Sequence, residues 1–240
     1  MVVEMTTDRV QTVLRAIADV PSETSPSLID QVCAAAVKVL SLRGSGVSLM
    51  VGGELRGRAG VSDAGISEIQ ELQLELGEGP GVDAWASGAA VSEPDIAHPK
   101  VVRWPAFAEA AERAGVVAVY AFPMRMGAIR IGVLVFYRDR VGELSAEEAA
   151  YGLVFADVAT HMVLGLQAGA PADELHEVLA DEPPHWAEIH QATGMVSVQL
   201  DVALSEAFVR LRAHAFASGR SLRAVSRDIL HGRLRLANSL

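Results

Sequence analysis

The sequence predicts an α+β domain built around an antiparallel sheet, followed by a small all-α unit of three helices. Two apolar runs rich in β-branched and aromatic residues, 116–122 and 128–138, are separated only by a short turn, as in a β-hairpin. Helical periodicity occurs before and after them, in 28–40 and in the long apolar stretch 149–170. Helices mixed with hairpin-connected strands are typical of the α+β class. After Pro183-Pro184 the pattern is helical only, which indicates a separate all-α unit.

The elements of the α+β part are predicted in chain order from local signals. A first helix is expected over residues 7–19, and a second begins at Ser25-Pro26 with proline at the favoured first position. Strands 46–51 and 53–59 are joined around Gly52-Gly53. Next come a helix over 66–76, a glycine-rich turn at 77–81, a helix over 105–114, the hairpin 116–138 with its turn at Met126-Gly127, and a long helix with a Ser145–Glu148 capping box.

The long apolar stretch is predicted to belong to a soluble protein. It carries Asp157 and His161 near its middle, and a central Asp costs about 2.5–3.5 kcal/mol on membrane-insertion scales. A buried or dimer-facing helix is therefore expected. The beginning of the sequence, MVVEMTTDR, shows no basic segment followed by an apolar run, as a secretory signal would. These features predict a cytoplasmic protein without a membrane partner.

Charge is divided unevenly along the chain, whose formal net charge is −10. Residues 1–183 hold 13 Lys and Arg against 26 Asp and Glu. Residues 184–240 hold seven Arg against four acids. An acidic body with a basic tail is the asymmetry expected of a nucleic-acid-binding output domain.

Each of the last three helices is expected to bury one apolar stripe. The stripes are Trp186, Ile189, Val196 and Leu200, then Leu204, Phe208, Leu211 and Ala215, then Leu222, Val225, Ile229 and Leu230. Outside the third stripe, Arg220, Arg223 and Arg227 follow at three- and four-residue steps. Such a row of arginines can meet phosphates, or loop bases by stacking and guanidinium hydrogen bonds.

Segment 190–230 resembles an ANTAR domain, the RNA-binding output module of bacterial transcription antiterminators. The resemblance rests on Ala192-Thr193-Gly194-Met195, on Glu206-Ala207, on the Leu211-Arg212-x-x-Ala215 step and on a third helix like 221–230. Two positions depart from the pattern. Thr193 stands where many relatives have Lys, and Ala203 stands where relatives often have a Ser or Thr N-cap, whose loss costs about 1 kcal/mol. Asp201 is the expected substitute cap.

This resemblance implies a function and a set of contacts. The partner would be a pair of RNA stem-loops, held in antiterminator form by a homodimer. The implied RNA contacts are Gln191, Ala192, Thr193, Gly194, Met195, Arg212, Arg220, Arg223 and Arg227. Periodicity alone cannot distinguish RNA from DNA, so a DNA-binding or protein-interaction regulator stays open as the alternative.

The preceding part resembles a GAF domain of the kind placed before ANTAR modules in actinobacterial proteins. The segments that carry the resemblance are LQLELGEGPGVDAW (72–85), SEPDI (92–96), RWPAF (103–107), the hairpin 116–138 and GELS (142–145). Many relatives read GEGPC, where this chain has Gly81 in place of Cys, so thiol or metal chemistry at that position is absent. The resemblance implies a sensor pocket for a small molecule, flanked by Asp83, Trp85, Asp95, Arg103 and Trp104. The alternative is that the two tryptophans pack the domain and Arg103 pairs with a carboxylate.

No catalytic residue, metal site or cofactor is expected, and the protein is predicted not to be an enzyme. The chain has a single cysteine, Cys33, which excludes a disulfide framework; it lies on the apolar face of the helix over 28–40. The seven histidines form no HExxH motif, and no serine nucleophile elbow appears. GEGPG lacks the Lys-Ser/Thr of a phosphate-binding P-loop. The predicted organisation is an N-terminal helix (1–24), a GAF sensor domain (25–168), a linker (169–183) and an ANTAR domain (184–240).

Overall fold

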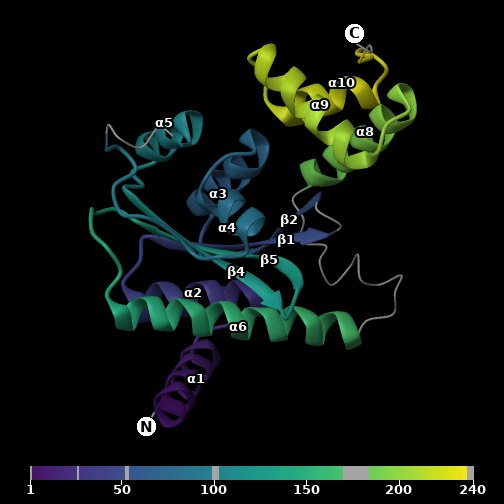
Figure 1. Ribbon diagram of the computed structural model, residues 1–240. Helices are drawn as coiled ribbons and strands as arrows, with labels where there is room; N and C mark the ends of the chain where they lie inside the picture. The colour runs from purple at the N-terminus through teal and green to yellow at the C-terminus, as the bar shows by residue number, and fades with distance from the viewer. Residues whose placement is uncertain (1, 26, 52–53, 99–102, 170–183, 237–240) are drawn as a thin grey trace.

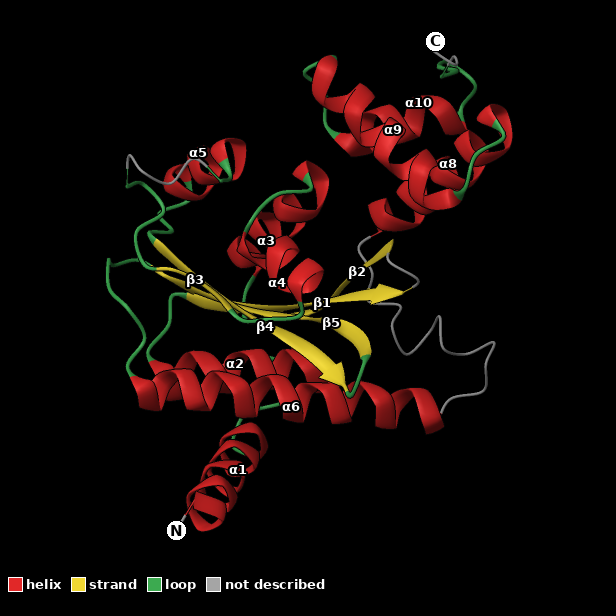
Figure 2. Cartoon of the chain, viewed as in Figure 1, coloured by secondary structure: helices red, strands yellow, loops and turns green. Residues whose placement is uncertain are grey.

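The computed structural model describes residues 2–25, 27–51, 54–98, 103–169 and 184–236, and its N-terminal part is an α+β domain. A five-stranded antiparallel sheet with the order β2-β1-β5-β4-β3 lies between two layers of helices (Figures 1 and 2). The strands are β1 (Gly44–Val51), β2 (Glu54–Val61), β3 (Val91–Glu93), β4 (Ala118–Met126) and β5 (Ile129–Arg138). The helices of this domain are α1 (Val2–Ala18), α2 (Leu28–Leu40), α3 (Ala64–Leu76), α4 (Pro80–Ser87), α5 (Pro105–Arg113) and α6 (Ala146–Gly169). The predicted fold class is confirmed for this part of the chain.

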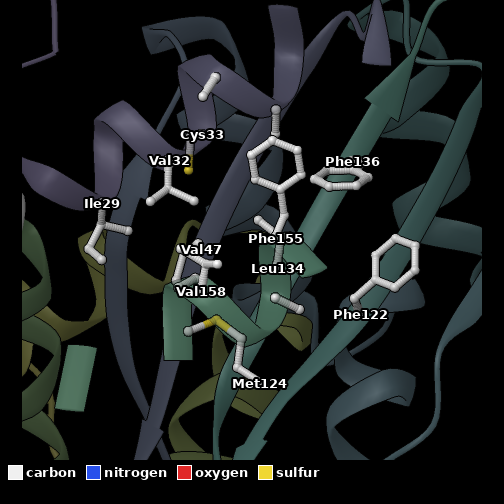
Figure 3. Packing of buried hydrophobic residues seen from close by; sticks show 14 of the residues in the cluster. Ile29, Val32, Cys33, Val47, Phe122, Met124, Leu134, Phe136, Phe155 and Val158 are labelled. Atoms are coloured by element: carbon white, nitrogen blue, oxygen red, sulfur yellow. The ribbon is translucent and has the colours of Figure 1, made fainter. Parts of the chain in front are cut away.

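Side chains of the central strands point alternately to the two faces of the sheet, and each face has its own hydrophobic core. Tyr120 and Phe136 face α2 and α6, while Val119 and Tyr137 face α3, α4 and α5. On the first side, the rings of Phe122 and Phe136 lie 5.3 Å apart, and the ring of Phe136 meets that of Phe155 edge-on at 6.4 Å. Figure 3 shows this side, where Cys33 and Val32 from α2 pack beside Val47 of the sheet. Because successive side chains of a strand point to opposite faces, one hairpin supplies both cores.

The long helix α6 is a core helix with one exposed side. The segment Ala146–Leu166 is long and apolar enough to cross a membrane, and 39% of its most apolar part is buried within the protein. Phe155 and Ala159 are fully buried against the sheet, whereas Leu153 is 57% exposed. A core helix of a soluble protein can be as long and as apolar as a membrane span, so the length and composition of α6 are weak evidence that it crosses a membrane. Its burial against the sheet confirms the prediction of a buried helix for one of its faces.

The start of α6 is fixed to the end of β5. Ser145 caps the helix, since its hydroxyl accepts from the N–H of Glu148 at 3.2 Å and its own N–H donates to the Glu148 carboxylate at 2.7 Å. This confirms the predicted capping box. The buried Arg138, the last residue of β5, forms an ion pair with the same carboxylate and lies over the ring of Tyr120 at 5.5 Å.

Several predicted boundaries are wrong for local reasons. Helix α2 begins at Leu28, because Ser27 and Asp30 form a capping box there, and Pro26 lies outside the described residues. The Gly52-Gly53 turn also lies outside them. The glycine-rich segment 77–81 is not only a turn, since α4 starts at Pro80 within it. Strand β3, only three residues long, was not predicted.

The C-terminal unit, α8 (Pro184–Leu200), α9 (Leu204–Ala217) and α10 (Leu222–Leu230), has a core of its own. From the predicted stripes Ile189, Val196, Leu200, Leu211, Ala215, Leu222, Val225 and Ile229 are buried there. Leu204 is an exception, at 48% exposed, because it is the first residue of α9. Ala203 is the N-cap of α9 and supplies no side-chain hydrogen bond, so the predicted cap at Asp201 is wrong. In Figure 1 this unit lies beyond the end of α3, on the side of the sheet away from α6.

Candidate functional site

The first candidate site joins two motifs of the N-terminal domain that are far apart in sequence. Glu78, from GEGP, accepts hydrogen bonds from the N–H groups of Ala106 at 2.7 Å and Phe107 at 2.8 Å, across 28 and 29 residues. These two N–H groups open α5, where no local side chain caps the helix. A carboxylate at a helix N-terminus satisfies donors that lack intrahelical partners and favourably meets the helix dipole. Glu78 therefore fixes α5 to the loop before α4.

Asp83 ties the same two motifs together a second time. Its carboxylate forms an ion pair with Arg103 at 2.5 Å and accepts from the indole N–H of Trp104 at 3.1 Å. The guanidinium of Arg103 also stacks over the Trp104 ring, 4.7 Å from its centroid. Trp104 itself is 2% exposed and belongs to the core under α3 and α5. The structure thus brings together three of the five predicted pocket residues, and they bind one another.

The other two predicted pocket residues lie apart from this group. Trp85 is half-buried beside Arg130, whose guanidinium lies 6.0 Å from the ring and donates to the carbonyls of Trp85 at 2.9 Å and Ala86 at 2.7 Å. Asp95 is half-buried, and its backbone N–H donates to the carboxylate of Glu93 at 3.4 Å. Among the described residues, no interaction links Asp95 to Asp83, Arg103 or Trp104.

A buried polar network between α3 and the sheet was not predicted from the sequence. The hydroxyl of Tyr137 donates to Gln70 at 3.0 Å and accepts from Gln73 at 2.8 Å. Gln70 also donates to Ser48 at 2.8 Å, and Gln73 accepts from the N–H of Gly81 at 2.7 Å. Complete burial raises the pKa of Tyr137, so its hydroxyl keeps its proton. Side chains of the protein itself occupy this part of the interior.

Gly81 has a packing reason to lack a side chain. A Cβ at this position would lie 3.0 Å from the side-chain oxygen of Gln73 and 3.2 Å from a methyl group of Val135. The hydrogen bond from Gly81 to Gln73 brings the two chain segments this close. A cysteine at this position would push against the buried network.

The second candidate site is the predicted nucleic-acid-binding face of the C-terminal unit. In its first segment, residues 191–195, some of the predicted contact residues are buried and others are exposed. Ala192 and Thr193 are buried, and the Thr193 hydroxyl donates to the carbonyl of Ile189 at 2.8 Å. Gln191 is exposed, Met195 is 37% exposed, and a Cβ on Gly194 would meet open space. In this conformation only the latter three lie open to a partner.

The arginines of α10 lie on the surface in exposed ion pairs. Glu188, on α8, pairs with Arg223 at 3.5 Å and Arg227 at 3.3 Å. Desolvation acts to raise the pKa of Glu188, but the hydrogen bonds and charges of Arg227 and Arg223 outweigh it and hold the pKa below its usual range. Two of the three arginines of the predicted row, Arg223 and Arg227, therefore share one face, with the carboxylate of Glu188 beside them.

Arg220 is held in the same way by a second carboxylate. Asp228 pairs with Arg220 at 2.5 Å and with Arg233 at 2.7 Å. Hydrogen bonds from Arg220 and Arg233 lower the pKa of Asp228. Arg233 follows α10 and shares the carboxylate of Asp228 with Arg220, but it was not among the predicted RNA contacts. Arg212 differs from these arginines, since it is half-buried and its guanidinium lies over the ring of Phe208 at 5.8 Å.

No group of three or more His, Cys, Asp or Glu side chains suited to a metal ion occurs in the part of the chain that the structure describes. Cys33 is fully buried, and this burial raises its pKa to about 12. A buried, protonated thiol is a poor nucleophile.

Comparison with known proteins identifies the fold of the N-terminal domain. No family model and no curated protein matches the sequence. Among solved structures, the chain is similar to the GAF domain of a phosphoenolpyruvate-protein phosphotransferase from Acinetobacter, at 12% identity over 68% of this chain and 96% of that chain, with a TM-score of 0.52. It is also similar to the GAF domain of the Coxiella burnetii phosphoenolpyruvate-protein phosphotransferase, at 14% identity over 68% of this chain and 95% of that chain, with a TM-score of 0.51. The N-terminal domain has the GAF fold. In this GAF domain, Glu78 and Asp83 connect the segment 78–83 to the start of α5 through their hydrogen bonds and the ion pair with Arg103.

Proposed function

We propose that the protein is a cytoplasmic, RNA-binding regulator of transcription antitermination. Its GAF domain, residues 25–168, senses a signal or joins two copies of the chain. Its C-terminal unit, residues 184–240, acts as an ANTAR domain that stabilises an antiterminator pair of RNA stem-loops. The linker assigned to 169–183 falls almost wholly outside the described residues.

One observation carries this proposal, the row of arginines on a separately packed three-helix unit. Arg223 and Arg227 lie on α10, whose opposite face is buried in the core of the unit, and Arg220 directly precedes the N-cap residue of this helix, Ser221. All three are partly exposed, with 40–50% of each side chain accessible. A rigid helix that presents a row of cations is suited to a phosphate backbone or to the splayed bases of an RNA loop.

The ion pairs of this row are of the kind that a polyanion can replace. Exposed pairs such as Arg227–Glu188 contribute little to stability in water. A phosphate group offers arginine the same bidentate, charge-assisted hydrogen bonds as a carboxylate does. The carboxylates of Glu188 and Asp228 thus hold the arginines on the surface, and RNA phosphates compete for them.

The proposed regulator acts as a homodimer. One row of three arginines makes few contacts, and two linked units that bind two stem-loops gain from a high effective concentration. Thiolate chemistry is not proposed for the GAF domain, because burial raises the pKa of its Cys33 thiol and keeps it protonated. Duplex DNA or a protein as the partner is a result that the following test would reveal.

The test is a titration of the full chain with paired RNA stem-loops and with duplex DNA of the same sequence, at several salt concentrations. We expect salt-dependent binding to the RNA, and replacement of both Arg223 and Arg227 by Ala should weaken it. The slope of log affinity against log salt should fall by about 1.4–1.8, for two lost phosphate contacts. Arg113→Ala serves as the control, because Arg113 is an exposed arginine of the GAF domain in a similar helical ion pair.

Three results would argue against the proposal. Equal binding of RNA and duplex DNA would favour a DNA-binding regulator. Binding of neither would favour a protein partner. RNA binding that the double substitution leaves unchanged would place the RNA site away from α10.

A further inference from the structure

A cavity of about 520 Å³ lies between the GAF domain and the C-terminal unit. The end of α3 supplies Glu75 and Leu76 to one wall, and α9 and α10 supply Val209, Arg212, Phe216 and Leu222 to the other. This volume falls within the range of roughly 300–1,000 Å³ that is usual for small-molecule sites, which occur preferentially at domain interfaces. The walls combine apolar side chains with four charged ones, which are Glu75, Glu78, Arg212 and Arg220.

The two walls touch at Gly77. Gly77 ends α3 in the left-handed conformation, with φ of 67°. The guanidinium of Arg212, from α9, lies so close that any Cβ at Gly77 would overlap its Nη1 atom. The cavity is therefore a cleft open to solvent at a direct contact between the domains, and Arg212 is part of that contact.

The cavity contains one acid and one base that lack a partner. Glu75 has no hydrogen bond or ion pair with any residue that the structure describes. Its pKa is raised, mainly by burial and to a smaller extent by the negative charge of Glu71. Arg212 likewise has no carboxylate partner among the described residues, and burial lowers its pKa. By contrast, the neighbouring Arg220 is paired with Asp228. Partly desolvated charges without partners are unfavourable, and a ligand of complementary charge would relieve both.

We propose that this cavity binds a small zwitterion with an apolar body. The ammonium group of the ligand meets Glu75, and its carboxylate meets Arg212, which offers a bidentate donor pair. The apolar body lies against Val209, Phe216 and Leu76. A free amino acid and a short peptide both have this chemistry.

Binding here has a consequence for the output of the protein, and that consequence rests on the proposed RNA-binding function. A ligand that contacts α3 and α9 together holds the two domains in contact. Arg212, one of the arginines assigned to RNA, then remains against Gly77 and is withheld from phosphate. The ligand would therefore lower the affinity of the full chain for RNA.

The first test is calorimetric titration of the full chain with leucine, leucyl-leucine, N-acetylleucine and leucine methyl ester. The two zwitterions should bind at least about tenfold more tightly than either capped derivative, each of which lacks one charge. Tighter binding of the dipeptide than of leucine would identify a peptide as the source of the ligand. If capped and uncapped compounds bind alike, or if none binds, the inference is wrong.

Two substitutions separate the roles of the charges. Glu75→Gln should abolish the preference for leucine over N-acetylleucine, and Arg212→Met should abolish the preference for leucine over its methyl ester. Glu68→Gln is the matched control, since it removes one carboxylate from the exposed side of α3 and should leave every affinity unchanged. Leucine binding that survives both cavity substitutions would place the ligand elsewhere and overturn the inference.

A second titration, of RNA with and without saturating leucine, distinguishes this inference from the proposed function. Leucine binding by a chain that binds no RNA would leave the cavity site standing and refute the proposed function. RNA binding without any zwitterion binding would refute the cavity site alone. A fall in RNA affinity on addition of leucine, lost in Glu75→Gln, would support both.

Discussion

The GAF domain and the C-terminal unit use carboxylates in opposite ways. Glu78 and Asp83 of the GAF domain bind backbone N–H groups and the indole of a buried tryptophan, over 20 or more residues of sequence. Glu188 and Asp228 of the C-terminal unit bind exposed arginines. A hydrogen bond to a backbone donor at a helix N-terminus helps to fix where that helix lies. An exposed ion pair can exchange one partner for another, so the difference separates architecture from binding surface.

The largest expected effect tests whether the GAF motifs are architectural. Trp104→Ala should lower the free energy of unfolding by about 3–5 kcal/mol, because it leaves a large cavity and removes the hydrogen bond from the indole to Asp83. Urea denaturation followed by circular dichroism would measure the loss. Trp85→Ala is the control, since Trp85 is only half-buried and should cost less. An equal loss in the two variants would contradict the structural role assigned to Trp104.

A smaller effect tests the tie between the loop before α4 and α5. Glu78→Ala removes the acceptor of two N–H groups and should lower the free energy of unfolding by about 2 kcal/mol. Hydrogen exchange should show faster exchange of the Ala106 and Phe107 amides. Glu68→Ala, an exposed acid on α3, should change stability by less than about 0.5 kcal/mol. Unchanged protection of α5 in the Glu78 variant would show that this helix needs no such cap.

The smallest effect tests the exchangeable side of the comparison. Glu188→Gln frees Arg223 and Arg227, so RNA affinity should rise a few-fold with little change in stability. Glu206→Gln is the matched control, because it breaks an exposed ion pair with Arg210 on α9 and leaves α10 untouched. If the two variants bind RNA alike, the gain comes from net charge and not from Glu188.

Acidification probes the same ion pair without a substitution. The pKa of Glu188 is lowered, so its pairs with Arg223 and Arg227 contribute to stability above the ordinary carboxyl pKa. That contribution is lost as the pH falls through the lowered value. The pH dependence of stability should accordingly be weaker in Glu188→Gln than in the unaltered chain.

Local sequence patterns predicted most of the architecture. Alternating and helical periodicity identified the hairpin that became β4 and β5. The stripes of α8, α9 and α10 predicted most of the residues of their shared core; Leu204 is exposed, and the side chain of Trp186 lies outside the described residues. Ser145 and Glu148 marked the start of α6, because both members of a capping box lie within four residues. Strand β3 was missed, since three residues are too few to show alternation.

The polar contacts of the candidate sites could not be predicted in this way. Nothing near Glu78 in sequence shows that its partners begin 28 residues later, and nothing near Tyr137 shows that its hydroxyl meets two glutamines of α3. Long-range partners depend on how the elements pack. The same limit applies to Thr193, whose position in the ANTAR-like pattern implied an RNA contact, whereas its side chain is buried against its own helix. The RNA contacts at the arginines stay a prediction.

The attachment of Arg138 to Glu148 gives α6 a mechanical property. Its first turn is bound to the sheet through this ion pair and the Ser145 cap, while its other end is Gly169. The helix has 24 residues and is therefore about 36 Å long. Because Phe155 and Ala159 in its middle are also fully buried against the sheet, α6 moves with the domain, and a rotation of the domain by about 5° about the first turn of α6 would carry its far end through about 3 Å. In this respect α6 is a rigid arm of the GAF domain, whose far end enlarges small rotations of the sheet.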